Sequence, residues 1–261
     1  MLRFAPNLTM LFTEAPFLER FALAAQAGAR EIEFLFPYEY QPQQLAEQLQ
    51  QHGLKQVLFN LPAGDWAAGE RGIAANPAKV AEFRAGVQRA LEYAAVLRVP
   101  TLNCLAGLAL PDVDAAEQRR TLVENIRYAA TACEQSQVRL VVEGINHLDM
   151  KGFNLNTAAQ VLSVLDEAGH ANAFLQYDLF HACREGEDIP AVLKANIARI
   201  AHIQIADVPG RHQPGSGTMD YPALFRLLEQ LGYQGAIGLE YIPQPNTSES
   251  LTWIEAYGYK L

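Results

Sequence analysis

The chain contains eight short runs with strand character, and each is separated from the next by a stretch long enough to form a helix. The runs lie at residues 4–9, 31–36, 56–61, 101–105, 139–143, 174–178, 202–206 and 236–240. Several are apolar on successive residues, as in Val141-Val142, which is typical of parallel strands covered on both faces. Eight such repeats predict an α/β fold, a closed (β/α)₈ TIM barrel, in a single domain spanning residues 1–261.

The intervening stretches show the apolar spacing of amphipathic helices. The spacing is clear at Phe83, Val87, Ala90, Leu91 and Ala94, and again at Leu224, Leu227, Leu228 and Leu231. Asp188 and Asp220 can each cap a helix whose first turn carries a proline, where a missing N–H is harmless. A doubly wound open sheet is the alternative fold, but the glycine pattern of a dinucleotide-binding loop is missing after the first strand.

The composition favours a globular domain that binds a small molecule. Half of the 261 residues are hydrophobic and 19% are charged, so the chain can bury a large core. Its net charge of −9 disfavours nucleic acid or an anionic membrane as a partner. Cys104, Cys133 and Cys183 form no CxxC pair, and no signal-peptide core or membrane span is present. We therefore expect a cytoplasmic protein.

Four polar residues stand at the far ends of consecutive predicted strands. They are Glu143, Asp178, Gln204 and Glu240. The C-terminal strand ends of a parallel barrel converge on one mouth, so these residues are expected to be neighbours. Taken singly, each has an ordinary alternative, because a strand-end acid often caps a helix and a glutamine often makes a routine hydrogen bond. Their shared position on four strands favours a common site.

Three carboxylates and an amide offer only oxygen ligands. This donor set suits a hard divalent cation, Mg²⁺ first, with Mn²⁺ or Co²⁺ also able to bind. Without a cation, three acids in a partly desolvated pocket would raise the pKa of at least one of them. The pattern therefore predicts a divalent metal site at the barrel mouth.

Several segments resemble the hydroxypyruvate isomerase family of xylose-isomerase-like barrels. They are residues 34–38 (FLFPY), 60–72 (NLPAGDWAAGERG), 204–207 (QIAD) and 238–241 (GLEY). The GDWAAGERG stretch is long and idiosyncratic, and the resemblance covers essentially the whole chain. It implies interconversion of hydroxypyruvate with 2-hydroxy-3-oxopropanoate (tartronate semialdehyde), or isomerisation or epimerisation of a related keto-acid or keto-sugar such as a 2-oxo-tetronate.

The resemblance also implies roles for individual residues. The paired catalytic glutamates of the family fall on Glu143 and Glu240, and its metal ligands fall on Glu143, Asp178, Gln204 and Glu240. The histidine that follows the aspartate is His181, a candidate for binding a substrate oxygen. These roles lead to a hypothesis for catalysis. One of Glu143 and Glu240 removes a proton next to the substrate carbonyl, and the other can return a proton to the neighbouring carbon.

Two long loops are expected at the same mouth, at residues 62–73 and 208–218. They carry Glu70, Arg71 and Arg211 as candidates for substrate binding, although Glu70 could instead be a partner of Arg71 within its loop. The chain departs from the family pattern at Gly144, Thr218 and Ile242, where relatives often have proline, glutamate and lysine. These departures alter the mouth and leave room for a longer substrate.

Other functions remain open at the level of sequence. Glycosidases also use two strand-end carboxylates but need no metal, so indifference to EDTA would favour hydrolysis. The endonuclease branch of the superfamily needs several histidine ligands and a basic surface, which six dispersed histidines and a charge of −9 do not supply. A binding protein without catalysis is the third possibility.

Overall fold

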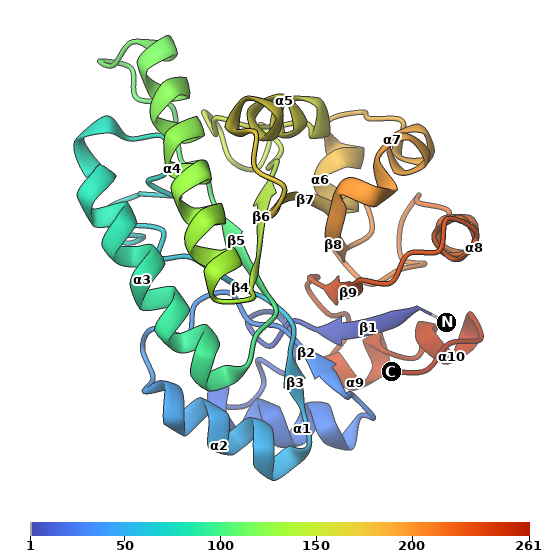
Figure 1. Ribbon diagram of the computed structural model, residues 1–261. Coiled ribbons are helices and arrows are strands. Elements are labelled where there is room, and N and C mark those ends of the chain that lie inside the picture. The colour runs from blue at the N-terminus through green and yellow to red at the C-terminus, as the bar shows by residue number, and fades with distance from the viewer. Residues whose placement is uncertain (1) are drawn as a thin grey trace.

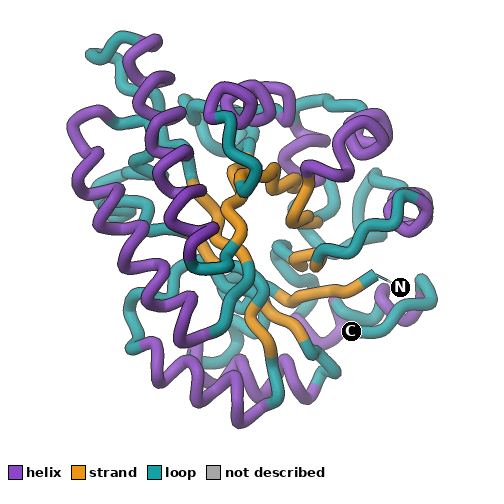
Figure 2. Tube along the Cα trace, viewed as in Figure 1, coloured by secondary structure: helices purple, strands orange, loops and turns teal. Residues whose placement is uncertain are grey.

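The computed structural model describes residues 2–261 and shows the predicted barrel. Parallel strands form the centre and the helices surround them (Figures 1 and 2). The strands are β1 (Arg3–Pro6), β2 (Glu31–Ile32), β3 (Lys55–Gln56), β4 (Phe59–Asn60), β5 (Thr101–Cys104), β6 (Arg139–Glu143), β7 (Ala173–Asp178), β8 (Ile200–Ile205) and β9 (Ala236–Leu239). No helix within residues 2–261 has both the length and the apolar character needed to cross a membrane.

The sheet closes on itself through its shortest strands. Seven strands pair in the order β1-β9-β8-β7-β6-β5-β4, and β2 pairs with β3. A parallel bridge between Asn7 and Glu33 joins β1 to β2, and the amide of Asn60 donates to the carbonyl of Leu35. The third predicted strand is therefore two pieces, β3 and β4, separated by Val57 and Leu58.

The first two strands are shorter than predicted because the chain turns early. Pro6 has no N–H, and Asn7 forms a turn in which its side chain accepts from the amide of Thr9 at 2.9 Å. The hydroxyl of Thr9 then accepts from the amide of Leu35, beyond the end of β2. The bridge between Asn7 and Glu33 continues the backbone pairing just past both strands, and the side-chain bonds of Asn7 and Thr9 follow it.

The outer helices begin where the sequence places their caps. They are α1 (Arg20–Gln26), α2 (Pro42–His52), α3 (Val80–Leu97), α4 (Ala115–Gln135), α5 (Ala158–Ala168), α6 (Leu179–Arg184), α7 (Ile189–Asn196), α8 (Tyr221–Gln230), α9 (Thr247–Ser250) and α10 (Trp253–Ala256). Asp188 caps α7 and Asp220 caps α8, as predicted. The predicted stripe of α3 is buried, whereas in α8 Leu224 and Leu228 are buried and Leu227 and Leu231 are half-buried.

The main core lies between the strands and the helices, and a small second cluster lies inside the barrel. The inner cluster consists mostly of small residues, including Ala5, Val141 and Ala236. Above it, toward the C-terminal ends, buried strand positions carry polar side chains: Asn7, Glu33, Asn60, Asn103, Glu143, Gln176, Asp178, His202 and Gln204. The barrel interior therefore changes from apolar to polar along its axis.

Candidate active site

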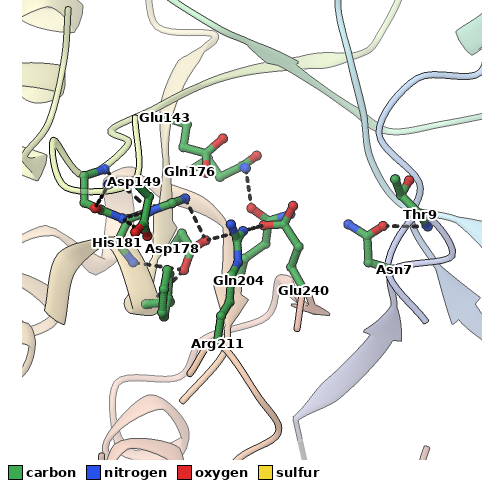
Figure 3. Close-up of polar contacts among 12 residues, drawn as sticks. Asn7, Thr9, Glu143, Asp149, Gln176, Asp178, His181, Gln204, Arg211 and Glu240 are labelled. Atoms are coloured by element: carbon green, nitrogen blue, oxygen red, sulfur yellow. Dashed lines mark hydrogen bonds and ion pairs between the residues drawn. The ribbon is translucent and has the colours of Figure 1, made fainter. Parts of the chain in front are cut away.

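The four strand-end residues meet at the C-terminal mouth (Figure 3). Glu143 and Asp178 end β6 and β7, Gln204 lies near the end of β8, and Glu240 directly follows β9. All four are buried. Register makes Asp178 and Gln204 lateral neighbours, and Gln204 also neighbours Gly238. The sequence-based expectation that these residues share one place agrees with this geometry.

Each carboxylate is held in place by a different donor. Asn103 Nδ2 donates to Glu143 Oε2 at 2.9 Å. Asp178 Oδ1 caps α6 by accepting from the amides of Phe180 (2.7 Å) and His181 (3.4 Å), which leaves Oδ2 for other contacts. Arg211 Nη2 lies 3.0 Å from Glu240 Oε2 and 3.9 Å from Asp178 Oδ2. One cation therefore faces two of the three carboxylates.

Burial and mutual repulsion make the two glutamates weak acids. Burial raises the pKa of Glu143 well above its usual range, and the charges of Glu240 and Asp178 raise it further. Burial also raises the pKa of Glu240 to about 8, against the opposing effect of Arg211. A metal-free cluster therefore favours protonated carboxyls, whereas a cation would favour the ionised forms.

The donor set fits a hard cation. Glu143, Asp178 and His181 each offer a ligand atom, and these atoms lie within 4.8 Å of one another. Gln204 adds a carbonyl oxygen, Oε1, which also accepts from Gln176 Nε2 at 2.6 Å. Carboxylate and amide oxygens in a buried pocket suit Mg²⁺ or Mn²⁺. Glu240, the fourth residue of the predicted ligand set, is not part of the group whose ligand atoms lie within 4.8 Å of one another.

Asn146 defines which ring nitrogen of His181 carries the proton. Asn146 Oδ1 accepts from the amides of Leu148 (3.1 Å) and Asp149 (2.9 Å), so the other end of the amide must be the NH₂ group. This group lies 2.6 Å from His181 Nδ1 and donates to it. Because Nδ1 accepts, the proton is on Nε2, which lies 3.5 Å from Asp178 Oδ2. Burial lowers the pKa of His181 to about 4, so the ring is neutral.

This tautomer favours hydrogen-bond donation over metal binding. A neutral imidazole that carries its proton on Nε2 has no lone pair there for a cation. Of the groups near the cluster, His181 is therefore suited to donate to an oxygen of a bound molecule.

Arg211 is presented by the loop after β8. Asp207, which is buried, accepts from the amides of Val208, Gly215, Gly217 and Met219 and so holds the two sides of the loop together. The amide of Ile242 donates to the carbonyl of Arg211 at 2.7 Å. The Arg211 guanidinium lies over the Phe180 ring, and its Nε is buried without a hydrogen-bond partner among residues 2–261. The loop thus places Arg211 beside the cluster with Nε available to donate a hydrogen bond.

Within residues 2–261, Glu70 and Arg71 of the loop after β4 form no hydrogen bond or ion pair with the cluster. Glu70 pairs with Lys79 at 2.7 Å and accepts from the amide of Asp65, while Arg71 stacks on Trp66 and donates to its carbonyl. All of these contacts are local. Lys79, rather than Arg71, is therefore the ionic partner of Glu70.

The three departures from the family pattern have different surroundings. A Cβ on Gly144 would lie 3.2 Å from the carbonyl carbon of Asn156, so the chain passes close there. Thr218 is exposed and bonds back to the carbonyl of Val208. The Ile242 side chain is half-exposed, while its backbone is tied to the loop of Arg211. Within residues 2–261, none of the three residues forms a hydrogen bond with a carboxylate of the cluster.

Sequence reasoning missed the polar residues that support the cluster. Asn103, Asn146, Gln176 and Glu33 all contact one of the predicted residues. The signal for Glu33 is the alternation Glu31-Ile32-Glu33-Phe34, since a period of two places both acids on one face of a strand. A polar face on a barrel strand points either to solvent or into the barrel.

Solved structures share this fold over nearly the whole chain. Residues 21–257 match a family described as xylose isomerase-like TIM barrel. A crystal structure from Brucella melitensis, named AP endonuclease, family 2, is 41% identical with a TM-score of 0.96, and the match covers 98% of this chain and 99% of that one. The 3-keto-D-glucoside 4-epimerase of E. coli, at 19% identity, a TM-score of 0.80 and the same coverage, shares the fold.

Two enzymes of known name are similar along their full lengths. The 2-oxo-tetronate isomerase of Cupriavidus necator is 46% identical over 98% of this chain and 99% of its own. The hydroxypyruvate isomerase of Escherichia coli is 44% identical over 98% of this chain and 100% of its own. The fold and the family match define the class, the xylose isomerase-like TIM barrels. Within that class, the chain belongs to the hydroxypyruvate isomerase family, a family of isomerases.

Proposed function

We propose that this protein is a metal-dependent isomerase that interconverts hydroxypyruvate and 2-hydroxy-3-oxopropanoate by proton transfer. The observation that carries the proposal is the buried group of Glu143, Asp178 and Glu240, with the pKa of both glutamates raised. When bound, a divalent ion would polarise the substrate carbonyl and stabilise the negative charge that develops as the adjacent C–H is broken. Glu143, Asp178, Gln204 and Glu240 would hold it.

The glutamates supply the base and the acid. One carboxylate takes a proton from C3 of hydroxypyruvate, which leaves an enediolate across C2 and C3. Delivery of a proton to C2, with transfer of the hydroxyl proton from O3 to O2, completes 2-hydroxy-3-oxopropanoate. A carboxyl with a pKa near neutrality is well matched to both duties, and burial raises the pKa of Glu240 towards that range, while a bound cation would lower it again.

Two further residues orient the substrate. Arg211 can bind the substrate carboxylate, because its Nε is a buried donor that lacks a partner. His181 can donate from Nε2 to a substrate oxygen, as its tautomer requires. Glu70 and Arg71 would act only by shaping the loop at the mouth, since all their contacts are local.

A 2-oxo-tetronate is the second candidate substrate. The similarity to the Cupriavidus necator enzyme of that name supports it, as does the half-exposed Ile242 in place of a charged lysine. The chemistry would be the same, with one more carbon bearing a hydroxyl group. A ratio of kcat/KM for the two substrates measures which one the mouth prefers.

Proton exchange tests the proposal directly. With Mg²⁺ in D₂O, the enzyme should wash deuterium into the carbon next to the carbonyl of hydroxypyruvate, and EDTA should stop the exchange. Tight binding without exchange would show a binding protein, and exchange that ignores EDTA would contradict metal dependence. Cleavage of a glycosidic substrate by the EDTA-treated protein would instead support a glycosidase.

A further inference from the structure

Glu33 is a fully buried carboxylate directly below the cluster. Its exposed fraction is 0%. Oε1 accepts from Asn7 Nδ2 at 2.9 Å and from Gln204 Nε2 at 2.8 Å, and Oε2 accepts from His202 Nε2 at 2.7 Å. No ion pair formed by a lysine or arginine of residues 2–261 involves it. Three side chains from separate parts of the chain therefore hold a carboxylate that is far too buried to serve solubility.

The barrel makes room for this carboxylate. Gly238 of β9 lies beside Gln204 in the sheet, and a Cβ there would come within 2.4 Å of both Glu33 oxygens. Any other residue at this position would displace the carboxylate, because the glutamate is enclosed on all sides. The space that Glu33 occupies therefore exists because position 238 of β9 is a glycine.

Glu33 determines which end of the Gln204 amide faces the mouth. Asn7 Oδ1 accepts from the amide of Thr9, so the Asn7 NH₂ group faces Glu33 Oε1 and makes this oxygen an acceptor. The Gln204 atom that faces the same oxygen is therefore the NH₂ nitrogen. The carbonyl oxygen therefore points away, toward Gln176 Nε2 at 2.6 Å, and keeps a second lone pair. With the amide reversed, an NH₂ group would face the carboxylate cluster, and an NH₂ group cannot bind a cation.

We propose that Glu33 is a positioning residue that orients Gln204 so that its carbonyl oxygen, rather than its NH₂ group, serves the cation. Glu33 itself contacts neither the cation nor the substrate. This inference rests on the proposed metal site and adds a reason for a glutamine at position 204. A metal ligand that is held by a buried partner typically loses about 10- to 100-fold in metal affinity when that partner is changed.

The test is a double-mutant cycle read by Mn²⁺ affinity, with free Mn²⁺ measured by electron paramagnetic resonance. Glu33→Gln places an NH₂ group among three donors, so the Gln204 amide should lose its fixed orientation and Mn²⁺ should bind at least about tenfold more weakly. In a Gln204→Glu background, both ends of the side chain are oxygens and orientation no longer matters. There, Glu33→Gln should leave Mn²⁺ affinity unchanged or improve it, because two facing carboxylates become one.

Controls separate positioning from general damage. Glu187→Gln, a matched change at a half-buried carboxylate that accepts from the amide of Ala158, should change Mn²⁺ affinity less than about twofold. If Glu33→Gln does not fold, Gly238→Ala provides the second perturbation, since its Cβ would displace the carboxylate, and the same cycle with Gln204→Glu applies.

The possible outcomes are distinct. An equal loss of affinity in both backgrounds would overturn the positioning role while the proposed metal site stands. A wild-type protein that binds no Mn²⁺ would overturn the metal site, and this inference with it. A loss confined to the glutamine background would support both.

Discussion

The two ends of the barrel treat charge in opposite ways. At the N-terminal end, a cavity of about 670 Å³ is lined by residues that include Arg3, Glu31, Gln56 and Arg139. There Arg3 pairs with Glu31 at 2.7 Å, and half of the Arg3 side chain is exposed. At the C-terminal end, three carboxylates are buried around one arginine.

The comparison teaches that volume does not locate chemistry in this fold. The N-terminal cavity is large, yet its arginines reach water: Arg3 is half-exposed beside Glu31, and Arg139 is exposed. Charges in contact with water cost little free energy. The C-terminal cluster gathers three acidic groups inside the protein and raises the pKa of two of them, a pattern typical of functional sites. Variants at the two ends should therefore differ in kind as well as in size of effect.

The largest effect is expected at the two glutamates of the cluster. Glu143→Gln and Glu240→Gln should each lower kcat by about 10³-fold, because an amide cannot move a proton. The metal-free variants should remain folded, since glutamine has the shape of a protonated glutamate and carries no charge; thermal melts check this. Near-normal kcat in both variants would show that the C-terminal cluster is not the site of proton transfer.

Metal removal should have the next largest effect. Chelation should reduce activity by about 10²-fold.

The effect of the metal on stability should depend on pH. Burial raises the pKa of Glu240 from 4.5 to about 8, so between these pH values the folded metal-free protein keeps a proton that the unfolded chain has released. This stabilising contribution is complete below pH 4.5 and is lost as pH rises toward 8. The Tm gained by adding Mg²⁺ should therefore be larger at about pH 8 than at about pH 5. An equal gain in Tm at the two pH values would show that ionisation of Glu240 does not destabilise the metal-free protein.

Arg211 should affect binding more than turnover. Arg211→Ala is expected to raise KM by roughly 30-fold with a smaller change in kcat, because it removes charge-assisted hydrogen bonds to the substrate carboxylate. Steady-state kinetics separate the two constants. Arg211→Lys keeps the charge but not the fork of donors and should fall between. A pure loss of kcat would instead assign Arg211 to the reaction step.

Asn146→Asp should change the tautomer of His181. The new carboxylate would accept a hydrogen bond from Nδ1–H, which reverses the arrangement set by the Asn146 amide. Nitrogen-15 NMR of the ring should show the proton move to Nδ1, and kcat/KM should fall roughly tenfold. The matched change Asn156→Asp, at an amide that donates to the carbonyl of Ile145, should leave the ring signals as they are. A wild-type ring already protonated on Nδ1 would refute the assignment.

The regular side of the barrel is readable from the sequence, and the irregular side is less so. Strands β5 to β9 were predictable because their buried apolar runs end at Glu143, Asp178 and similar polar residues. The ends of β1 and β2 were not, since only a single bridge and the side-chain bonds of Asn7 and Thr9 follow them. Local pattern does not reveal such contacts.

The site shows the same division. The four strand-end residues follow from the rule that parallel strand ends converge, so the sequence was sufficient to group them. Their support was not predictable, because whether a polar residue such as Asn103 faces the barrel or the helices depends on strand register. The orientation of Gln204 depends on Glu33, which is 171 residues away in the chain.

The smallest effect is expected at the N-terminal end. Arg139 lines the cavity there and its side chain forms no hydrogen bond or ion pair with residues 2–261. Arg139→Ala should therefore change kcat/KM and Mn²⁺ affinity by less than about twofold, as for other exposed positions away from a site. Assays beside Arg211→Ala give a direct comparison of one arginine at each end. A large loss in Arg139→Ala would mean that the lower cavity is coupled to the reaction, and the path would run through His202, which lines that cavity and contacts Glu33.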